Sequence, residues 1–264
     1  MQPMANMALR AARQAVSKIT TAFDRPDLIK VSSKGQNDYV TNIDKDVQYI
    51  IIRELKKAYP EHSFRGEEDQ SNENNPESDY EWIIDPIDGT TNFVHNIPHF
   101  CISIACLNKG KVEHGVILDP MRQEEFVASK GKGCTVNGHR ARCGDKTSLL
   151  GALVGTGGFD AELAEQQGAV YQKMITENAT VRSAGSAALD LAYVATGRMD
   201  AVWFKNLSIW DMAAGVLMIQ ETGGLLGDFK GGAGHLQSGD IVAGSPKVFK
   251  ALAPIVKKSF AEAG

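Results

Sequence analysis

Two aspartates three residues apart, Asp85 and Asp88, lie in the segment of this sequence best suited to chemistry. They follow a short apolar run at 82–84, which is typical of a buried strand. Pro86 cannot donate a hydrogen bond to a neighbouring strand, so we expect the strand to end there. Both carboxylates would then leave the sheet together, and carboxylates are the ligands that hard cations prefer.

The residues after Asp88 suit a tight turn and a helix start. Gly89 permits the turn, and Thr90 or Thr91 is expected to begin a helical turn. Backbone N–H groups at a helix start bind anions. A cation site beside a phosphate site is the arrangement that phosphoryl transfer needs. The alternative is a turn with solvated aspartates. The further motifs found elsewhere in the chain argue against this alternative.

The segment 85–93, Asp-Pro-Ile-Asp-Gly-Thr-Thr-Asn-Phe, resembles the signature of the inositol monophosphatase family. Trp210 and Asp211, followed by small residues, match a second family motif about 120 residues farther on. The resemblance extends over nearly the whole chain and is closest to the bacterial inositol-1-monophosphatase branch, the SuhB type. It implies a Mg²⁺-dependent, lithium-sensitive phosphomonoesterase.

The resemblance also implies a set of metal ligands. One comes from a Gly-Glu-Glu motif, and the others belong to the two signatures. Four carboxylates are too many for one Mg²⁺ and suit two or three ions that share phosphate oxygens. The implied ligands are the side chains of Glu67, Asp85, Asp88 and Asp211 and the backbone carbonyl of Ile87.

Catalytic roles follow from the same resemblance. Glu67 and Thr90 are expected to orient and deprotonate the attacking water. Asp88 and Asp211 would surround the ion that takes the leaving oxygen. The N–H groups of Gly89 and Thr90 would hold phosphate oxygens. No cysteine or serine nucleophile is required.

An upstream pattern, Asp-x-Val-Thr-x-x-Asp, is matched at 38–44. Asp44 stands just before a predicted helix, where an aspartate makes a good N-cap. In the family the last aspartate of this pattern reaches toward an additional, weaker metal, and the lysine upstream lies near the metal and phosphate. The resemblance therefore adds Asp44 and Lys34 to the site, and capping is compatible with metal binding.

The substrate contacts are expected in the C-terminal part. A helix is predicted to start near Ser186, and the resemblance assigns Gly185, Ser186 and Ala187 to the polyol part of the substrate. Tight helix packing is the structural alternative for the alanines. Family members that process inositol phosphate usually carry Glu seven residues before the Trp-Asp aspartate, whereas this chain has Phe204.

The predicted activity is hydrolysis of inositol 1-phosphate or a similar polyol phosphate. Related metal phosphatases act on fructose 1,6-bisphosphate, histidinol phosphate or adenosine bisphosphate, and these remain alternatives. A third interpretation, from another class, is a binding partner in a transcription complex.

The element pattern and the resemblance together predict an α+β fold, an αβαβα layered sandwich. Residues 1–145 are expected to form an N-terminal α+β half with most metal ligands. Residues 146–264 would form a C-terminal α/β half with the Trp-Asp motif and the substrate contacts. The resemblance implies a homodimer.

Composition narrows the class of protein. The net charge is −4, so the composition does not show the excess of basic residues that is typical of nucleic-acid-binding proteins. Charged residues interrupt the N-terminal segment, so we expect no signal peptide, and no run is long enough to cross a bilayer. The four cysteines lack metal-ligand spacing and are expected to be free thiols in the cytoplasm.

Overall fold

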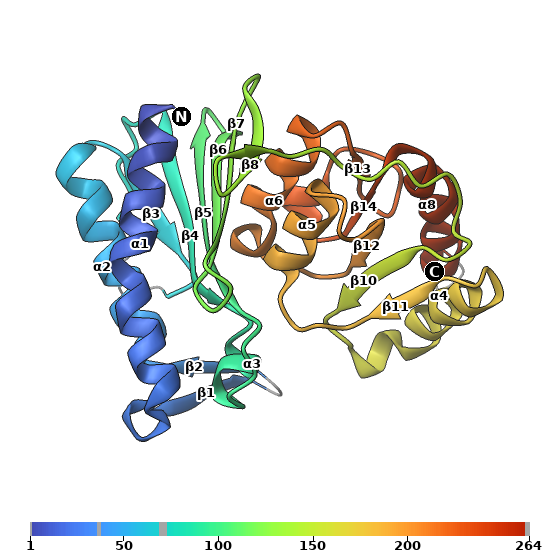
Figure 1. The fold of residues 1–264 in the computed structure, drawn as a ribbon, viewed down its shortest axis with the longest axis horizontal. Helices are drawn as coiled ribbons and strands as arrows, with labels where there is room; N and C mark the ends of the chain where they lie inside the picture. Colours follow the sequence, from blue (N-terminus) through green and yellow to red (C-terminus); the bar gives the residue numbers. More distant parts are fainter. Residues whose placement is uncertain (1, 36–37, 69–72, 262–264) are drawn as a thin grey trace.

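The computed structural model describes residues 2–35, 38–68 and 73–261. Helices and sheets alternate in five layers (Figure 1), which confirms the predicted αβαβα sandwich. One pair of helices covers the outer face of a large sheet, a second pair lies between two sheets, and a third covers the far face of the smaller sheet. The pairs are α1 (Pro3–Asp24) with α2 (Asn42–Ala58), α5 (Ala187–Ala195) with α6 (Ile209–Glu221), and α4 (Ala164–Thr176) with α8 (Pro246–Ala261).

The large sheet has seven strands in the order β3-β4-β5-β6-β7-β8-β9. β3 and β4 pair in parallel, and the later neighbours form an antiparallel meander joined by short turns. The strands are β3 (Ser63–Gly66), β4 (Tyr80–Asp88), β5 (Cys101–Asn108), β6 (Lys111–Asp119), β7 (Glu124–Ser129), β8 (Gly133–Val136) and β9 (His139–Arg140).

The smaller sheet has five strands in the order β11-β10-β12-β14-β13. β10 pairs in parallel with β11 and β12, whereas β14 runs antiparallel to its neighbours. Its strands are β10 (Leu153–Gly157), β11 (Thr180–Arg182), β12 (Ala201–Phe204), β13 (Leu225–Gly227) and β14 (Ile241–Gly244). The remaining elements are the ribbon β1 (Val31–Gly35) and β2 (Asp38–Thr41), and the short helices η1 (Pro26–Leu28), α3 (Thr90–Val94), η3 (Ala161–Leu163) and α7 (His235–Ser238).

Three hydrophobic clusters fill the spaces between the layers. The first joins α1 and α2 to the large sheet, the second surrounds α5 and α6, and the third lies under α4 and α8. α1 approaches closely because its buried face carries alanines. Each layer therefore buries the apolar face that its sequence period presents.

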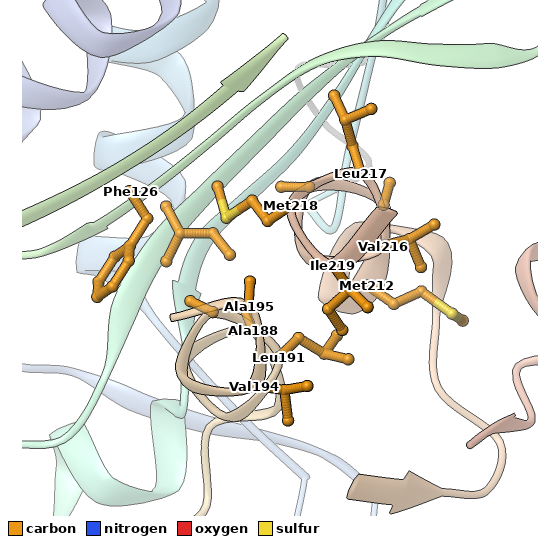
Figure 2. Packing of buried hydrophobic residues seen from close by; sticks show 14 of the residues in the cluster. Phe126, Ala188, Leu191, Val194, Ala195, Met212, Val216, Leu217, Met218 and Ile219 are labelled. Carbon is orange, nitrogen blue, oxygen red and sulfur yellow. The ribbon is translucent and has the colours of Figure 1, made fainter. Parts of the chain in front are cut away.

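The middle layer is the one that meets both sheets (Figure 1). Side chains of α5, such as Leu191, lie beside side chains of α6, such as Met212 and Ile219 (Figure 2). Small residues permit the close approach. A Cβ at Gly215 would lie 2.5 Å from the Cβ of Leu191, and one at Gly115 would lie 3.0 Å from the backbone of Ala214. The two helices are thereby fixed against the sheet that carries Asp85 and Asp88.

All four cysteines are free, as expected. Among the described residues, no helix combines the length and the apolar character that a membrane crossing requires.

Candidate active site

Three carboxylates from distant parts of the chain meet between the large sheet and the middle helices. One oxygen each of Asp85, Asp88 and Asp211 can be chosen so that all three lie within 4.8 Å of one another. Asp85 and Asp88 come from β4, and Asp211 comes from the first turn of α6. The fold thus brings together two of the motifs that the sequence separated.

The strand that carries the pair does not stop at Pro86, so that prediction was wrong. β4 continues through Pro86 to Asp88, and its register against β5 shifts between Asp85 and Asp88. Asp85 faces Ser103 and Asp88 faces Cys101, so β4 uses one residue more than β5 over this stretch. Such a bulge tolerates a residue without an N–H group.

The turn after the bulge depends on Gly89, which has φ of +96° and caps α3. A Cβ there would lie 3.0 Å from the carbonyl oxygen of Gly185 and 3.1 Å from that of His99. Thr90 starts α3, as predicted, and its hydroxyl donates to the carbonyl of Ile87 at 2.9 Å. The signature segment therefore lies directly against the segment predicted to contact substrate.

Asp44 occupies the third position of α2 and is not its N-cap, so the capping prediction was wrong by three residues. The N-cap is Thr41, and the two residues form a capping box. Thr41 has a hydroxyl that accepts from the first-turn N–H groups, and its own N–H donates to Asp44 Oδ2 at 2.9 Å. Asp44 Oδ1 accepts from the Thr90 hydroxyl at 3.3 Å, which links α2 to the signature.

Ser186 is the N-cap of α5, in agreement with the predicted helix start. Its hydroxyl donates to Asp88 Oδ2, and the N–H of Ala188 donates to the same oxygen at 2.8 Å. The thiol of Cys101 lies 3.8 Å from that oxygen. The sequence assigned this segment to substrate alone, and nothing in its residue types revealed that it also holds Asp88.

Asp211 is fixed at the start of α6 by its own helix. Its Oδ2 accepts the N–H of Ser208 at 2.7 Å. The carbonyl of Trp210 accepts from the hydroxyl of Ser103 at 3.1 Å, which ties this end of α6 to β5. The carboxylate of Asp211 is thereby held where it meets the other two.

Glu67 follows β3 and is anchored to β4, because its N–H donates to the carbonyl of Ile84 at 3.0 Å. Its side chain is not a member of the group within 4.8 Å, but its charge raises the pKa of both Asp85 and Asp211. Lys34 belongs to β1, and its side chain lies outside the described part of the structure.

Burial disfavours the ionised form of the aspartates in this site. Burial is the largest cause that raises the pKa of Asp85, Asp88 and Asp211, and the neighbouring carboxylates raise the pKa of Asp85 and Asp211 further. Asp44 behaves likewise, since burial outweighs its hydrogen bonds and raises its pKa to about 6. No described lysine or arginine forms an ion pair with these four aspartates.

This chemistry fits a divalent cation. Several buried carboxylates without a basic partner repel one another, and a hard cation is the group that removes the repulsion while it uses their oxygens as ligands. The donor atoms are oxygens, which suit Mg²⁺, Ca²⁺ or Mn²⁺ better than softer metals.

Comparison with known proteins decides the family. The sequence pattern of the inositol monophosphatase family matches residues 1–260. The chain belongs to the inositol monophosphatase family. A curated relative, the "Nus factor SuhB" of Pseudomonas aeruginosa, is 50% identical over 257 residues, which cover 96% of this chain and 95% of the relative.

Solved structures agree with this assignment. The "extragenic suppressor protein suhB" of Bartonella henselae superimposes with a TM-score of 0.94 at 36% identity, over 97% of this chain and 99% of that one. An IMPase of Thermotoga maritima gives a TM-score of 0.89 at 31% identity, over 98% of both chains. The protein is thus a phosphoric monoester hydrolase of a family that uses divalent metal.

Proposed function

We propose that this phosphatase hydrolyses inositol 1-phosphate or a similar polyol phosphate with two or three Mg²⁺ ions. The observation that supports the proposal most is the convergence of three aspartates, two buried and the third, Asp211, partly buried. Their pKa values are raised, and they have no basic partner among the described residues. The proposed ligands are the side chains of Glu67, Asp85, Asp88 and Asp211 and the carbonyl of Ile87.

Bound Mg²⁺ would supply positive charge to the phosphate and lower the pKa of a coordinated water. Glu67 and Thr90 would orient the attacking water, and the carboxylate of Glu67 would accept its proton. The N–H groups of Gly89 and Thr90 would donate to phosphate oxygens. Asp44 and Lys34 would lie at the edge of the site, where Asp44 already holds the Thr90 hydroxyl at 3.3 Å.

The substrate would lie against Gly185, Ser186 and Ala187, close to Asp88 and Asp211. Phe204 cannot accept a hydrogen bond from a substrate hydroxyl, and it is 3% exposed. The neighbouring Lys205 is held by Asp240, with Nζ 2.9 Å from Oδ1. These facts favour a substrate range broader than inositol phosphate alone, because a site that pairs fewer hydroxyls rejects fewer analogues.

A panel of phosphate esters tests the proposal. It should contain inositol 1-phosphate, glycerol 2-phosphate, fructose 1,6-bisphosphate, histidinol phosphate and adenosine 3′,5′-bisphosphate, each assayed with Mg²⁺ and with EDTA. We expect the highest kcat/KM for a polyol monophosphate and no turnover in EDTA. A preference for one of the last three esters would assign the protein to a related metal phosphatase instead.

A second candidate function is a binding role in a transcription complex. It is supported by the name of the 50% identical relative, "Nus factor SuhB". A deletion strain rescued fully by the Asp88→Ala protein would make binding the main role.

We further propose that the protein is a cytoplasmic homodimer inhibited by lithium, and that residues 1–145 and 146–264 act as one unit. Sedimentation of the purified protein would test the dimer.

A further inference from the structure

Gln48 is a buried glutamine on α2 whose amide is paired with a single residue of another segment. Gln48 is 0% exposed. The Oε1 atom accepts the N–H of Glu68 at 3.0 Å, and the Nε2 group donates to the carbonyl of Glu68. A side-chain amide can both donate and accept, so Gln48 pairs with the backbone of Glu68 as the backbone of a neighbouring strand would.

This pairing holds the segment that carries Glu67. On one side the N–H of Glu67 donates to the carbonyl of Ile84 in β4, at 3.0 Å. On the other side the next residue is held at both its N–H and its carbonyl by Gln48. Glu67 is therefore fixed between the large sheet and α2, although it lies beyond the end of β3.

The fit around Gln48 is tight. A Cβ at Gly66 would overlap Gln48 Oε1, so the amide approaches the backbone of β3 too closely for any other residue there. Gln48 also lies four residues after Asp44, on the same face of α2. One helix face thus places Asp44 against Thr90 and Gln48 against Glu68.

We infer that Gln48 is a positioning residue, which sets the affinity for the divalent cation by holding Glu67 toward Asp85 and Asp211. The inference rests on the proposed function, in which Glu67 is a ligand. Gln48 itself touches no reacting group. Partners that orient metal ligands typically change metal affinity by about 10–100-fold when they are removed. The rate at saturating metal should change far less, because the ligand reaches the same place once the ion is bound.

The Gln48→Glu variant tests this with almost no change in shape, because a carboxylate cannot donate to the carbonyl of Glu68. We expect Mn²⁺ binding, measured by calorimetry on the full-length protein, to weaken at least about 10-fold. The Mg²⁺ concentration that gives half-maximal phosphatase activity should rise by the same factor, with kcat at saturating Mg²⁺ within about twofold of wild type. Amide hydrogen exchange at 67–68 should be faster. Gln48→Met, which removes both hydrogen bonds without adding charge, should behave alike.

Gln167 offers a matched control in the C-terminal half. It is 6% exposed, and its amide also joins two backbone groups, the N–H of Asp160 at 3.3 Å and the carbonyl of Gly158 at 3.1 Å. Gln167→Glu should lower thermal stability but leave Mn²⁺ affinity unchanged.

Two results would overturn the inference. The first is wild-type Mn²⁺ affinity in both folded Gln48 variants, and the second is an equal loss of affinity in Gln167→Glu, which would indicate general destabilisation. If the wild-type protein itself bound no cation, the proposed function would fall and the positioning role with it. The wild-type titration therefore separates failure of the function from failure of this inference.

Discussion

Asp44 should make the cation-free protein less stable as the pH rises. Burial raises its pKa from 3.8 to about 6, and the residue is 1% exposed, so solvent does not screen the effect. A group that binds its proton more tightly when folded contributes its full stability below pH 3.8. That contribution is lost as the pH rises through about 6.

The magnitude follows from the two pKa values. Between about pH 5 and about pH 8 the folded state should lose about 1–2 kcal/mol relative to the unfolded state through Asp44 alone. His62 and three other histidines, whose pKa values burial lowers, act in the opposite direction over part of this range. The comparison must therefore be between wild type and Asp44→Asn, because the histidines cancel in the difference.

The assay is urea unfolding of both proteins in EDTA at several pH values. The hydrogen bonds that the Asp44→Asn variant fails to make change the difference in free energy of unfolding between the two proteins by the same amount at every pH. The titration of Asp44 in wild type makes a contribution to this difference that depends on pH. We expect the free energy of unfolding of wild type, relative to Asp44→Asn, to fall by about 1–2 kcal/mol from about pH 5 to about pH 8. A difference that is flat or rises over this range would refute the argument that burial raises the pKa of Asp44.

Three further predictions concern the site and one partly buried histidine. Asp85→Asn should reduce Mg²⁺-dependent phosphatase activity more than about 100-fold, which is the upper range for partners that only orient ligands. It should not lower the thermal stability of the cation-free protein, because it removes a carboxyl group whose ionisation burial and the neighbouring carboxylates disfavour. Substantial remaining turnover would contradict the assignment. Ser186→Ala should weaken Mg²⁺ binding about 10-fold, since Asp88 loses a donor; an unchanged Mg²⁺ titration of activity would argue against that contact. Burial lowers the pKa of His62, whose Nδ1 accepts from Trp82 Nε1 at 3.0 Å, so this interaction stabilises the protein above pH 6.5 and is lost as the pH falls. His62→Gln should therefore flatten the acid side of the stability profile, and a profile as steep as that of wild type would contradict it.

Much of the fold was predictable because the apolar periods of the sequence match the layers. The strand at 82–84 and the helix starts near Thr90 and Ser186 follow directly from spacing and turn residues. The strand end at Pro86 was misjudged, because a local rule about proline does not reveal a bulge, which depends on the partner strand β5. The cap of α2 was misplaced because both Thr41 and Asp44 are good capping residues, and the capping box uses the two together.

The candidate site was predictable in its residue types and less so in its connections. The spacing within the signature suggested that Asp85 and Asp88 leave the sheet together, whereas the approach of Asp211 depends on how α6 packs. The contacts of Ser186 with Asp88, and of Gln48 with Glu68, join residues with no shared pattern in the sequence. Such contacts require the packed structure, since many serines and glutamines in the chain could have served.

The central claim is that Asp85, Asp88 and Asp211 bind divalent cations together. Anomalous diffraction from a crystal soaked in Mn²⁺ tests it most directly, because Mn²⁺ takes the same oxygen ligands as Mg²⁺. We expect at least two anomalous peaks, each roughly 2.2 Å from carboxylate oxygens of this group and spaced about 3.5–4 Å apart. Three carboxylates that remain without a peak at a Mn²⁺ concentration that fully activates phosphate-ester hydrolysis would contradict the claim.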